Sequence, residues 1–483
     1  MNDLAERALL ELDAARRKIA ARPLTSLGAA GFVVSAGIVV IGGRVPIADS
    51  ITPLTSWLGL QHEQANARAL AAAAYGGICL LLVLWLIALR VLHRTPRRER
   101  CVWWLAGIWA LPFVVGPPLL STDVYGYVAD GSLVRAGANP YDQAATALGQ
   151  APIVGALDIN SRGAVSTSGP LTTWAEHAII TVCAGHVLAA VIVLRVIAVA
   201  AAIGIGLLAR QLAGARSVAA LGLTVLNPAV LLLVVSACHL EGVLAVLLLG
   251  AIVSARRGRW PAAVAFAAVA GLLAPVALIA VPAVIIAHTA THRVRPVRAI
   301  ARDVAVAAVL LVAGFFSVRD GLGWLRNVNT LTRGEYTPFA PASLVADLLD
   351  PIVRPASSDD LATGARIAAG AAAGCIALYL LITARMRPLD HTIGYALLTF
   401  GLLAPVLHPW YLLWGTLALA PMATRIRRDV VVALSCAACV LVPVGLAGAA
   451  ALNLSRATLG VIALILLARL IGRQRAARAL VIG

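Results

Sequence analysis

Charged residues are scarce in this sequence. Asp, Glu, Lys and Arg together make up 13% of the 483 residues, whereas about a quarter is usual in a soluble domain. Apolar residues make up 61% of the chain, and its mean hydropathy is +0.91. This composition excludes an ordinary soluble enzyme and predicts a protein that lies in a lipid bilayer.

Several motifs of soluble catalysts are also absent. The sequence has no Gly-rich phosphate loop, no HExxH metal motif, no nucleophile elbow and no DxD triplet of the kind that binds nucleotide sugars. Its seven cysteines are scattered, mostly in apolar runs, and lack the paired spacing of a disulfide framework or a zinc site. A substrate that carries a nucleotide is therefore not expected.

Long apolar runs are abundant. A bilayer core takes about twenty helical residues to cross, and stretches of this size or somewhat shorter recur along the chain. They predict an all-α polytopic membrane protein with a bundle of about 14 transmembrane helices. The stretches are 26–42, 69–92, 101–120, 188–209, 217–237, 242–255, 260–273, 276–290, 303–317, 364–384, 393–407, 409–423, 430–450 and 457–472.

The basic residues, which give a formal net charge of +17, collect in alternate loops between these stretches. HRTPRRER at 93–100 and RIRR at 425–428 are examples. Because basic residues resist translocation, we predict that these loops are cytoplasmic, together with an amphipathic segment 1–25 and a tail 473–483. Residues 26–472 then form a single transmembrane domain of a plasma-membrane protein, and the positive charge does not indicate nucleic acid.

The alternate set of loops contains two long polar segments, 121–187 and 318–363. The same charge asymmetry predicts that these segments are extracytoplasmic and carry short interfacial helices. The functional site is therefore expected on the outer face.

Asp123 begins the first of these segments, in the sequence STDVYGY. It lies where the apolar run ends, and partial desolvation there can raise the pKa of a carboxylate toward that of a general base. As an alternative, Asp123 simply caps a helix that starts at Val124, and the nearby tyrosines form an interfacial aromatic belt. Several polar residues follow Asp123, and together they predict a sugar-binding surface. They are Tyr125, Tyr127, Arg135, Asn139 and Tyr141.

Two short outward turns are unusually polar. SACHLEG contains His239 and Glu241, and LLAPVLHPWYLLW contains His408, Trp410 and Tyr411. A histidine at a helix end is commonly a cap or an interfacial residue. Two such turns on the same side, however, predict a shared site.

Two arginines are candidates to bind a phosphate. Arg195 lies inside the predicted span 188–209, where a charge is costly, so we expect it near the outer end of that helix, facing protein or a lipid phosphate. Arg333 lies in the loop 318–363, next to Glu335 and Tyr336.

The motifs STDVYGY, NPY, SGPL, LNP, His-x-Glu and HPWYLLW occur in this order over residues 121–414. Together they resemble the actinobacterial polyprenol-phosphomannose-dependent α-1,6-mannosyltransferases. The resemblance implies the GT-C architecture, with many transmembrane helices and an extracytoplasmic active site. It also implies that Asp123 is the catalytic base and that Arg135, Arg195 and Arg333 are cations near the donor phosphate.

The implied reaction moves mannose from polyprenyl-phosphate mannose to the 6-hydroxyl of an α-1,6-mannan acceptor, with inversion. This reaction belongs to lipomannan and lipoarabinomannan backbone synthesis, where the acceptor is a mannan or a phosphatidylinositol mannoside glycolipid. A GT-C transferase of another polyprenyl-phosphate sugar, such as arabinofuranose or glucose, is one alternative. A non-enzymatic transporter of lipid-linked sugars is another.

Two further questions stay open at the sequence level. GT-C enzymes commonly carry the base in the loop after the first helix, and here the loop 43–68 offers Asp49 and Glu63, which rank behind Asp123. A divalent metal is possible, with Asp123, Glu241 and His408 as ligands, but their spacing is too dispersed to predict one.

Overall fold

The computed structural model describes residues 23–45, 57–60, 63, 65–93, 99–157, 159–291, 296–327, 340–350, 358–405 and 407–441. Most of the predicted N-terminal segment, the predicted span 457–472 and the tail 473–483 lie outside these residues.

Every regular element in the described part of the chain is a helix, which confirms the all-α prediction. In chain order the helices are α2 (Pro23–Gly42), η1 (Trp57–Gly59), α3 (Ala67–His93), α4 (Glu99–Val115), α5 (Asp123–Arg135), η2 (Ala145–Leu148), α6 (Pro152–Gly155), α7 (Ile159–Arg162), α8 (Pro170–Val182), α9 (Val187–Ala213), η3 (Gly214–Arg216), α10 (Ser217–Leu223), η4 (Val230–Ser236), α11 (Glu241–Arg256), α12 (Trp260–Leu273), η5 (Pro275–Ile279), α13 (Ala280–Thr291), α14 (Pro296–Phe316), α16 (Pro341–Leu349), α17 (Ser358–Ile382), η6 (Ala384–Met386), α18 (Leu389–Leu402), α19 (Tyr411–Leu419), η7 (Ala420–Met422) and α20 (Arg425–Leu441).

Five helical segments are long and apolar enough to cross a bilayer, or six if one bent pair counts as a single span. The predicted number of about 14 spans is therefore not confirmed in the described part of the chain. Many predicted stretches do form helices, but short ones: the 14 residues of α12 reach about 21 Å at 1.5 Å per residue. The five long segments are Leu24–Gly42, Ala67–His93, Val187–Leu223, Val297–Phe316 and Asp360–Ile382.

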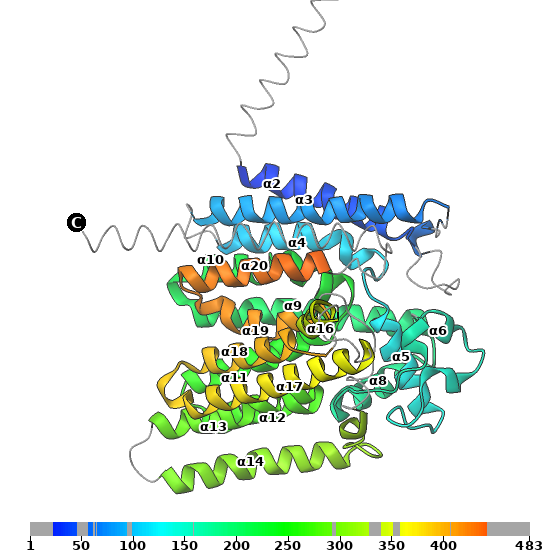
Figure 1. Ribbon diagram of the computed structural model, residues 1–483. Helices are drawn as coiled ribbons and strands as arrows, with labels where there is room; N and C mark the ends of the chain where they lie inside the picture. The colour runs from blue at the N-terminus through cyan, green and yellow to red at the C-terminus, as the bar shows by residue number, and fades with distance from the viewer. Residues whose placement is uncertain are drawn as a thin grey trace, which may run out of the picture.

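The long helices lie side by side, with α2, α3 and α4 along one edge and α14 along the opposite edge (Figure 1). Helices α5, α6 and α8 gather beyond one end of this array, where α5 packs against α8 and α9. The segment 121–187 thus forms a small helical layer at that end, as expected for a loop that carries short helices.

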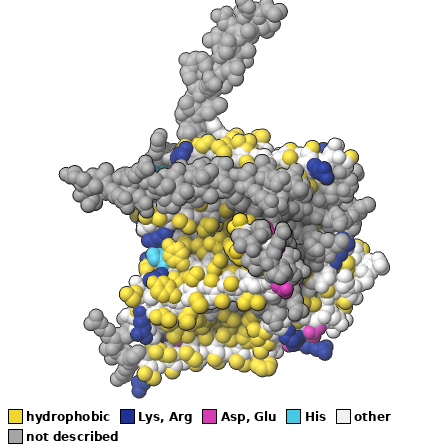
Figure 2. Space-filling model, viewed as in Figure 1, with side chains coloured by type: hydrophobic (Ala, Val, Ile, Leu, Met, Phe, Trp, Pro, Cys, Tyr) yellow, Lys and Arg dark blue, Asp and Glu magenta, His cyan; other side chains and the backbone are white. Residues whose placement is uncertain are grey.

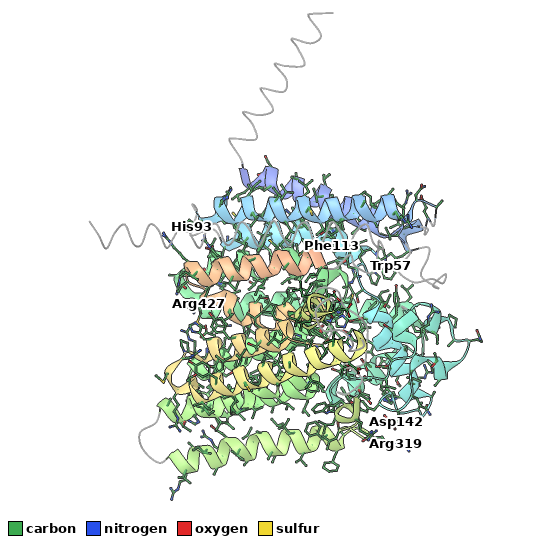
Figure 3. The ribbon with its side chains drawn as sticks, in the orientation of Figure 1. Trp57, His93, Phe113, Asp142, Arg319 and Arg427 are labelled. Carbon is green, nitrogen blue, oxygen red and sulfur yellow. The ribbon has the colours of Figure 1, made fainter. Side chains whose placement is uncertain are left out.

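On the face seen in Figure 2, the described part of the array is mainly hydrophobic, and basic side chains lie toward its ends. Large apolar side chains such as Val309 and Phe316 on α14 are exposed, as expected where lipid rather than water is the solvent. His93 and Arg427 lie at one end of the array, and Trp57, Asp142 and Arg319 lie at the other (Figure 3). The two sets of loops are thus separated in space.

The predicted span 217–237 is not one continuous helix, and that prediction is wrong. Helix α10 stops at Leu223, and the π-helix η4 begins at Val230. Pro228 cannot donate a backbone hydrogen bond between them. The side chain of Asn227 compensates: its Oδ1 accepts from the amide of Ala229, and its Nδ2 donates to Leu223 O and Ser435 Oγ.

Helices α18 and α19 approach each other through two glycines. A Cβ added at Gly415 would lie 2.2 Å from the carbonyl oxygen of Gly394, which is far too close for a real contact. The absence of side chains at these two positions therefore allows the backbones of the two helices to approach each other closely.

We predict that Gly415→Ala lowers the free energy of unfolding by about 1–3 kcal/mol, because the methyl group forces the two backbones apart. The measurement is thermal or denaturant unfolding in detergent micelles. Gly374→Ala on α17 is the matched control, since a Cβ at Gly374 meets nothing within 4 Å. Equal stability of the two variants would contradict the close-packing interpretation.

Candidate functional site

Three segments that are far apart in the sequence meet at the imidazole of His239. Its Nδ1 lies 3.4 Å from Oδ2 of Asp123, at the start of α5, and 3.7 Å from Oε2 of Glu241, at the start of α11. Its ring stacks on Trp410, which precedes α19, with the ring centroids 4.0 Å apart. The structure thus brings together the carboxylate and the two turns that the sequence marked separately.

The aromatic rings at this point form a stack. Trp410 stacks on both His239 and His408, and the His408 and Trp410 centroids are 4.6 Å apart. Tyr411 meets the His408 ring edge-on at 5.0 Å. Burial lowers the pKa of His408 to about 4, so its imidazole is neutral near pH 7 and packs as an aromatic ring.

Helix dipoles favour negative charge at this meeting point. Asp123 is the first residue of α5, Glu241 is the first residue of α11, and Trp410 caps the start of α19. Each helix N-terminus carries a partial positive charge of about half an elementary charge. Because the side chain of Asp123 is about one-third exposed (35%), it is also open to a substrate.

The two tyrosines near Asp123 have different surroundings. Burial raises the pKa of Tyr127, as do the neighbouring carboxylates Glu241 and Asp123, and its hydroxyl bonds to the backbone of Leu240. Burial also raises the pKa of Tyr125 to about 12, and that side chain lies near Cys238 rather than the carboxylates. Tyr127 is therefore the tyrosine that borders the site.

The structure does not bring the other predicted residues of α5 to this point. Arg135 lies twelve residues after Asp123, which is about 18 Å along a helix. Beyond it, Asn139 donates to Asp142 and Asp320. The buried hydroxyl of Tyr141 bonds to Ser168 O and Thr173 Oγ1. The single sugar-binding surface expected from Tyr125 to Tyr141 is thus divided between the two ends of α5.

Of the two predicted phosphate-binding arginines, the structure describes Arg195. It is buried and faces protein, which is one of the two surroundings expected for it, and its guanidinium donates to backbone carbonyls of Phe113, Val114, Gly116 and Ser236. Arg333 lies outside the described residues.

The alternative base Glu63 forms an exposed ion pair with Arg44 at 3.4 Å. Asp49, the other alternative, lies outside the described residues. For a metal, no group of three or more His, Cys, Asp or Glu side chains within the described ranges is arranged to hold an ion.

Sequence reasoning missed a second pair of acids beneath Asp123. Asp130 follows Asp123 by seven residues and Tyr127 by three, so all three share one face of α5. Glu176 on α8 packs against this face. A Cβ added at Gly131 would lie 2.4 Å from the backbone carbonyl oxygen of Glu176, so only glycine fits at position 131. Both carboxylate oxygens of Glu176 are buried without a hydrogen-bond partner among the described residues. The spacing 123, 127 and 130 is the signal that predicts this polar face.

The two acids have raised pKa values. Burial raises the pKa of Glu176 well above its usual range, and the charge of Asp130 raises it further. Burial raises the pKa of Asp130 to about 7, although a hydrogen bond from Ser166 acts in the opposite direction and lowers it. The pair therefore holds at least one proton near neutral pH, since two adjacent buried carboxylates do not both ionise readily.

We predict that the stability of the protein falls as the pH rises from about 4 to about 7. The pKa of Asp130 is about 7 in the fold and about 4 in an unfolded chain. The folded protein favours the neutral form of Asp130. The stabilisation by the neutral acid is therefore fully present below about pH 4, and it is lost as the pH rises to about 7. Thermal unfolding in micelles between pH 4 and 8 measures this, and Asp130→Asn should flatten the dependence. An unchanged slope in that variant would contradict the assignment.

The architecture and the site together define a class: a helical protein with a lipid-compatible exterior and a cluster of acidic and histidine side chains where three of its helices begin. Residues 25–290 match the family described as "Alpha-(1->6)-mannopyranosyltransferase, N-terminal domain", and residues 348–478 match the "MptB C-terminal domain". The chain therefore belongs to the α-(1→6)-mannopyranosyltransferase family, which confirms the resemblance seen in its motifs.

Curated relatives agree with this assignment. The chain is 27% identical over 441 residues to α-(1→6)-mannopyranosyltransferase A of Mycobacterium tuberculosis, covering 84% of this chain and 81% of the relative. It is 28% identical over 362 residues to α-(1→6)-mannopyranosyltransferase B of Corynebacterium glutamicum, covering 66% and 58%. No solved structure matches the chain. These findings support a membrane mannosyltransferase, which transfers mannose from a donor to a glycolipid or mannan acceptor.

Proposed function

We propose that the protein transfers mannose from polyprenyl-phosphate mannose to the 6-hydroxyl of an α-1,6-mannan acceptor, with inversion, on the outer face of the plasma membrane. The observation that carries this proposal is the Asp123 carboxylate, about one-third exposed and lying against His239 at the meeting point of three helix N-termini. Membership of a mannosyltransferase family supports the sugar and the linkage.

In this mechanism the acceptor's 6-hydroxyl oxygen attacks the anomeric carbon of β-linked mannosyl phosphate. The bond from that carbon to the phosphate oxygen breaks, and polyprenyl phosphate leaves with the electron pair. Asp123 takes the hydroxyl proton. Because attack and departure occur on opposite faces of the sugar, the new linkage is α.

The surrounding residues have different roles in this proposal. His239, 3.4 Å from Asp123, orients the carboxylate toward the acceptor. Glu241, 3.7 Å from His239, and Tyr127 offer hydrogen bonds to sugar hydroxyls. The leaving group is already a phosphate, so the protein supplies a base and positioning rather than an acid.

We predict that Asp123→Asn lowers kcat by about 10²–10⁴-fold, because the amide cannot accept the proton. The measurement is mannose transfer in membranes from polyprenyl-phosphate mannose to an α-1,6-mannan oligosaccharide. Asp142→Asn is the matched control, since Asp142 is an exposed carboxylate of the same segment that pairs with Arg326 at 2.7 Å. Undiminished transfer by Asp123→Asn would remove the base assignment.

The donor is tested in the same membranes. Unlabelled polyprenyl-phosphate mannose should compete with the labelled donor, whereas polyprenyl-phosphate arabinofuranose and glucose should not. Stronger competition by either of these would assign the protein to a different sugar within the same architecture.

A further inference from the structure

Arg195 is a buried charge that has no acidic partner. Its side chain is 5% exposed, and no carboxylate lies within ion-pair distance of it among the described residues. A buried charge is costly unless its donors are satisfied. Here backbone carbonyls and one thiol satisfy them, which gives Arg195 an unusual set of contacts for a membrane arginine.

The carbonyls belong to the C-terminal ends of two helices. Nη1 donates to Phe113, Val114 and Gly116 at the end of α4, and Nη2 donates to Ser236 at the end of η4 at 3.0 Å. Carbonyls at a helix C-terminus lack intrahelical partners and carry partial negative charge. The guanidinium neutralises both ends at once.

Both helix ends lead directly into the candidate site. Asp123 follows Gly116 by seven positions, and Ser236 precedes His239 by three. Arg195 also donates from Nε to the thiol of Cys238 at 2.9 Å, and Cys238 is the residue immediately before His239. The Arg195 side chain thus contacts both the segment that leads to Asp123 and the segment that leads to His239.

The backbone at Cys238 needs such support. Its φ is +60°, in the left-handed region that a residue with a side chain rarely adopts. At this point the chain turns by 112° between η4 and α11. A conformation of this kind persists where surrounding contacts over-determine it. Arg195 holds the chain just before the turn, at Ser236, and at the turn itself, at Cys238.

We infer that Arg195 is the positioning residue that sets the geometry of Asp123 and His239, rather than a ligand of the donor phosphate. The inference rests on the proposed function for its kinetic consequence, but its geometric content is independent of that function. Lysine cannot replace it, because a single ammonium cannot reach two helix ends and a thiol in separate directions.

The kinetic test compares Arg195→Lys, Arg195→Ala and the control Arg210→Met. Arg210 lies on the same helix α9, half-exposed, and pairs with Glu99 at 2.5 Å. Arg195→Lys should lose at least about 100-fold in kcat, as expected for a misplaced base, with the donor KM changed less than about threefold. Guanidinium ion should restore part of the kcat of Arg195→Ala, and Arg210→Met should stay within about twofold of the wild type. A raised donor KM at unchanged kcat would overturn the inference.

A second test does not depend on activity. Cys238 is 1% exposed beneath Arg195. In Arg195→Ala, maleimide labelling of Cys238, measured by mass spectrometry of its peptide in membrane vesicles, should rise at least tenfold and fall again with guanidinium. Protection equal to that of the wild type would overturn the inference. If Asp123→Asn proved fully active while Cys238 became labelled, the base assignment would fail and the positioning contact would stand.

Discussion

The contact between the Arg195 guanidinium and two helix C-termini is the interaction on which the candidate site depends. Helices α4 and η4 end next to each other, and their unpaired carbonyls would repel without a cation between them. The buried charge is stabilised by those same carbonyls. The guanidinium charge and the two helix ends therefore stabilise each other. From these ends the chain continues to Asp123 after α4 and to His239 after η4, and the two side chains meet.

A second constraint is the placement of acidic side chains at helix starts, where burial raises the pKa of Glu241 to about 8. Asp123 and Glu241 each begin a helix whose N-terminal dipole favours a carboxylate, while the adjacent histidines are buried as rings rather than cations. The helix starts thus favour acidic groups at this end of the helical array. This arrangement suits a reaction that needs a proton acceptor beside an uncharged sugar hydroxyl.

Sequence patterns predicted the helices well and their assembly less well. The apolar run 260–273 coincides with α12, because apolar length alone determines such a helix. The break within 217–237 escaped prediction, since it depends on Pro228 and on the side chain of Asn227, which bonds across to Ser435. The motifs marked Asp123, His239 and Trp410 individually. Their meeting depends on tertiary contacts between segments more than a hundred residues apart, which the motifs do not reveal. The separation of Asp123 from Tyr141 follows from α5, because the whole helix lies between them.

The position of Trp410 bears on how a carbohydrate is recognised here. Its indole already stacks on two imidazoles, those of His239 and His408. Indole surface that stacks on an imidazole is not open to the apolar side of a pyranose ring. The tryptophan therefore holds two histidine rings in place, and polar groups such as the Asp123 carboxylate are left to distinguish one sugar hydroxyl from another.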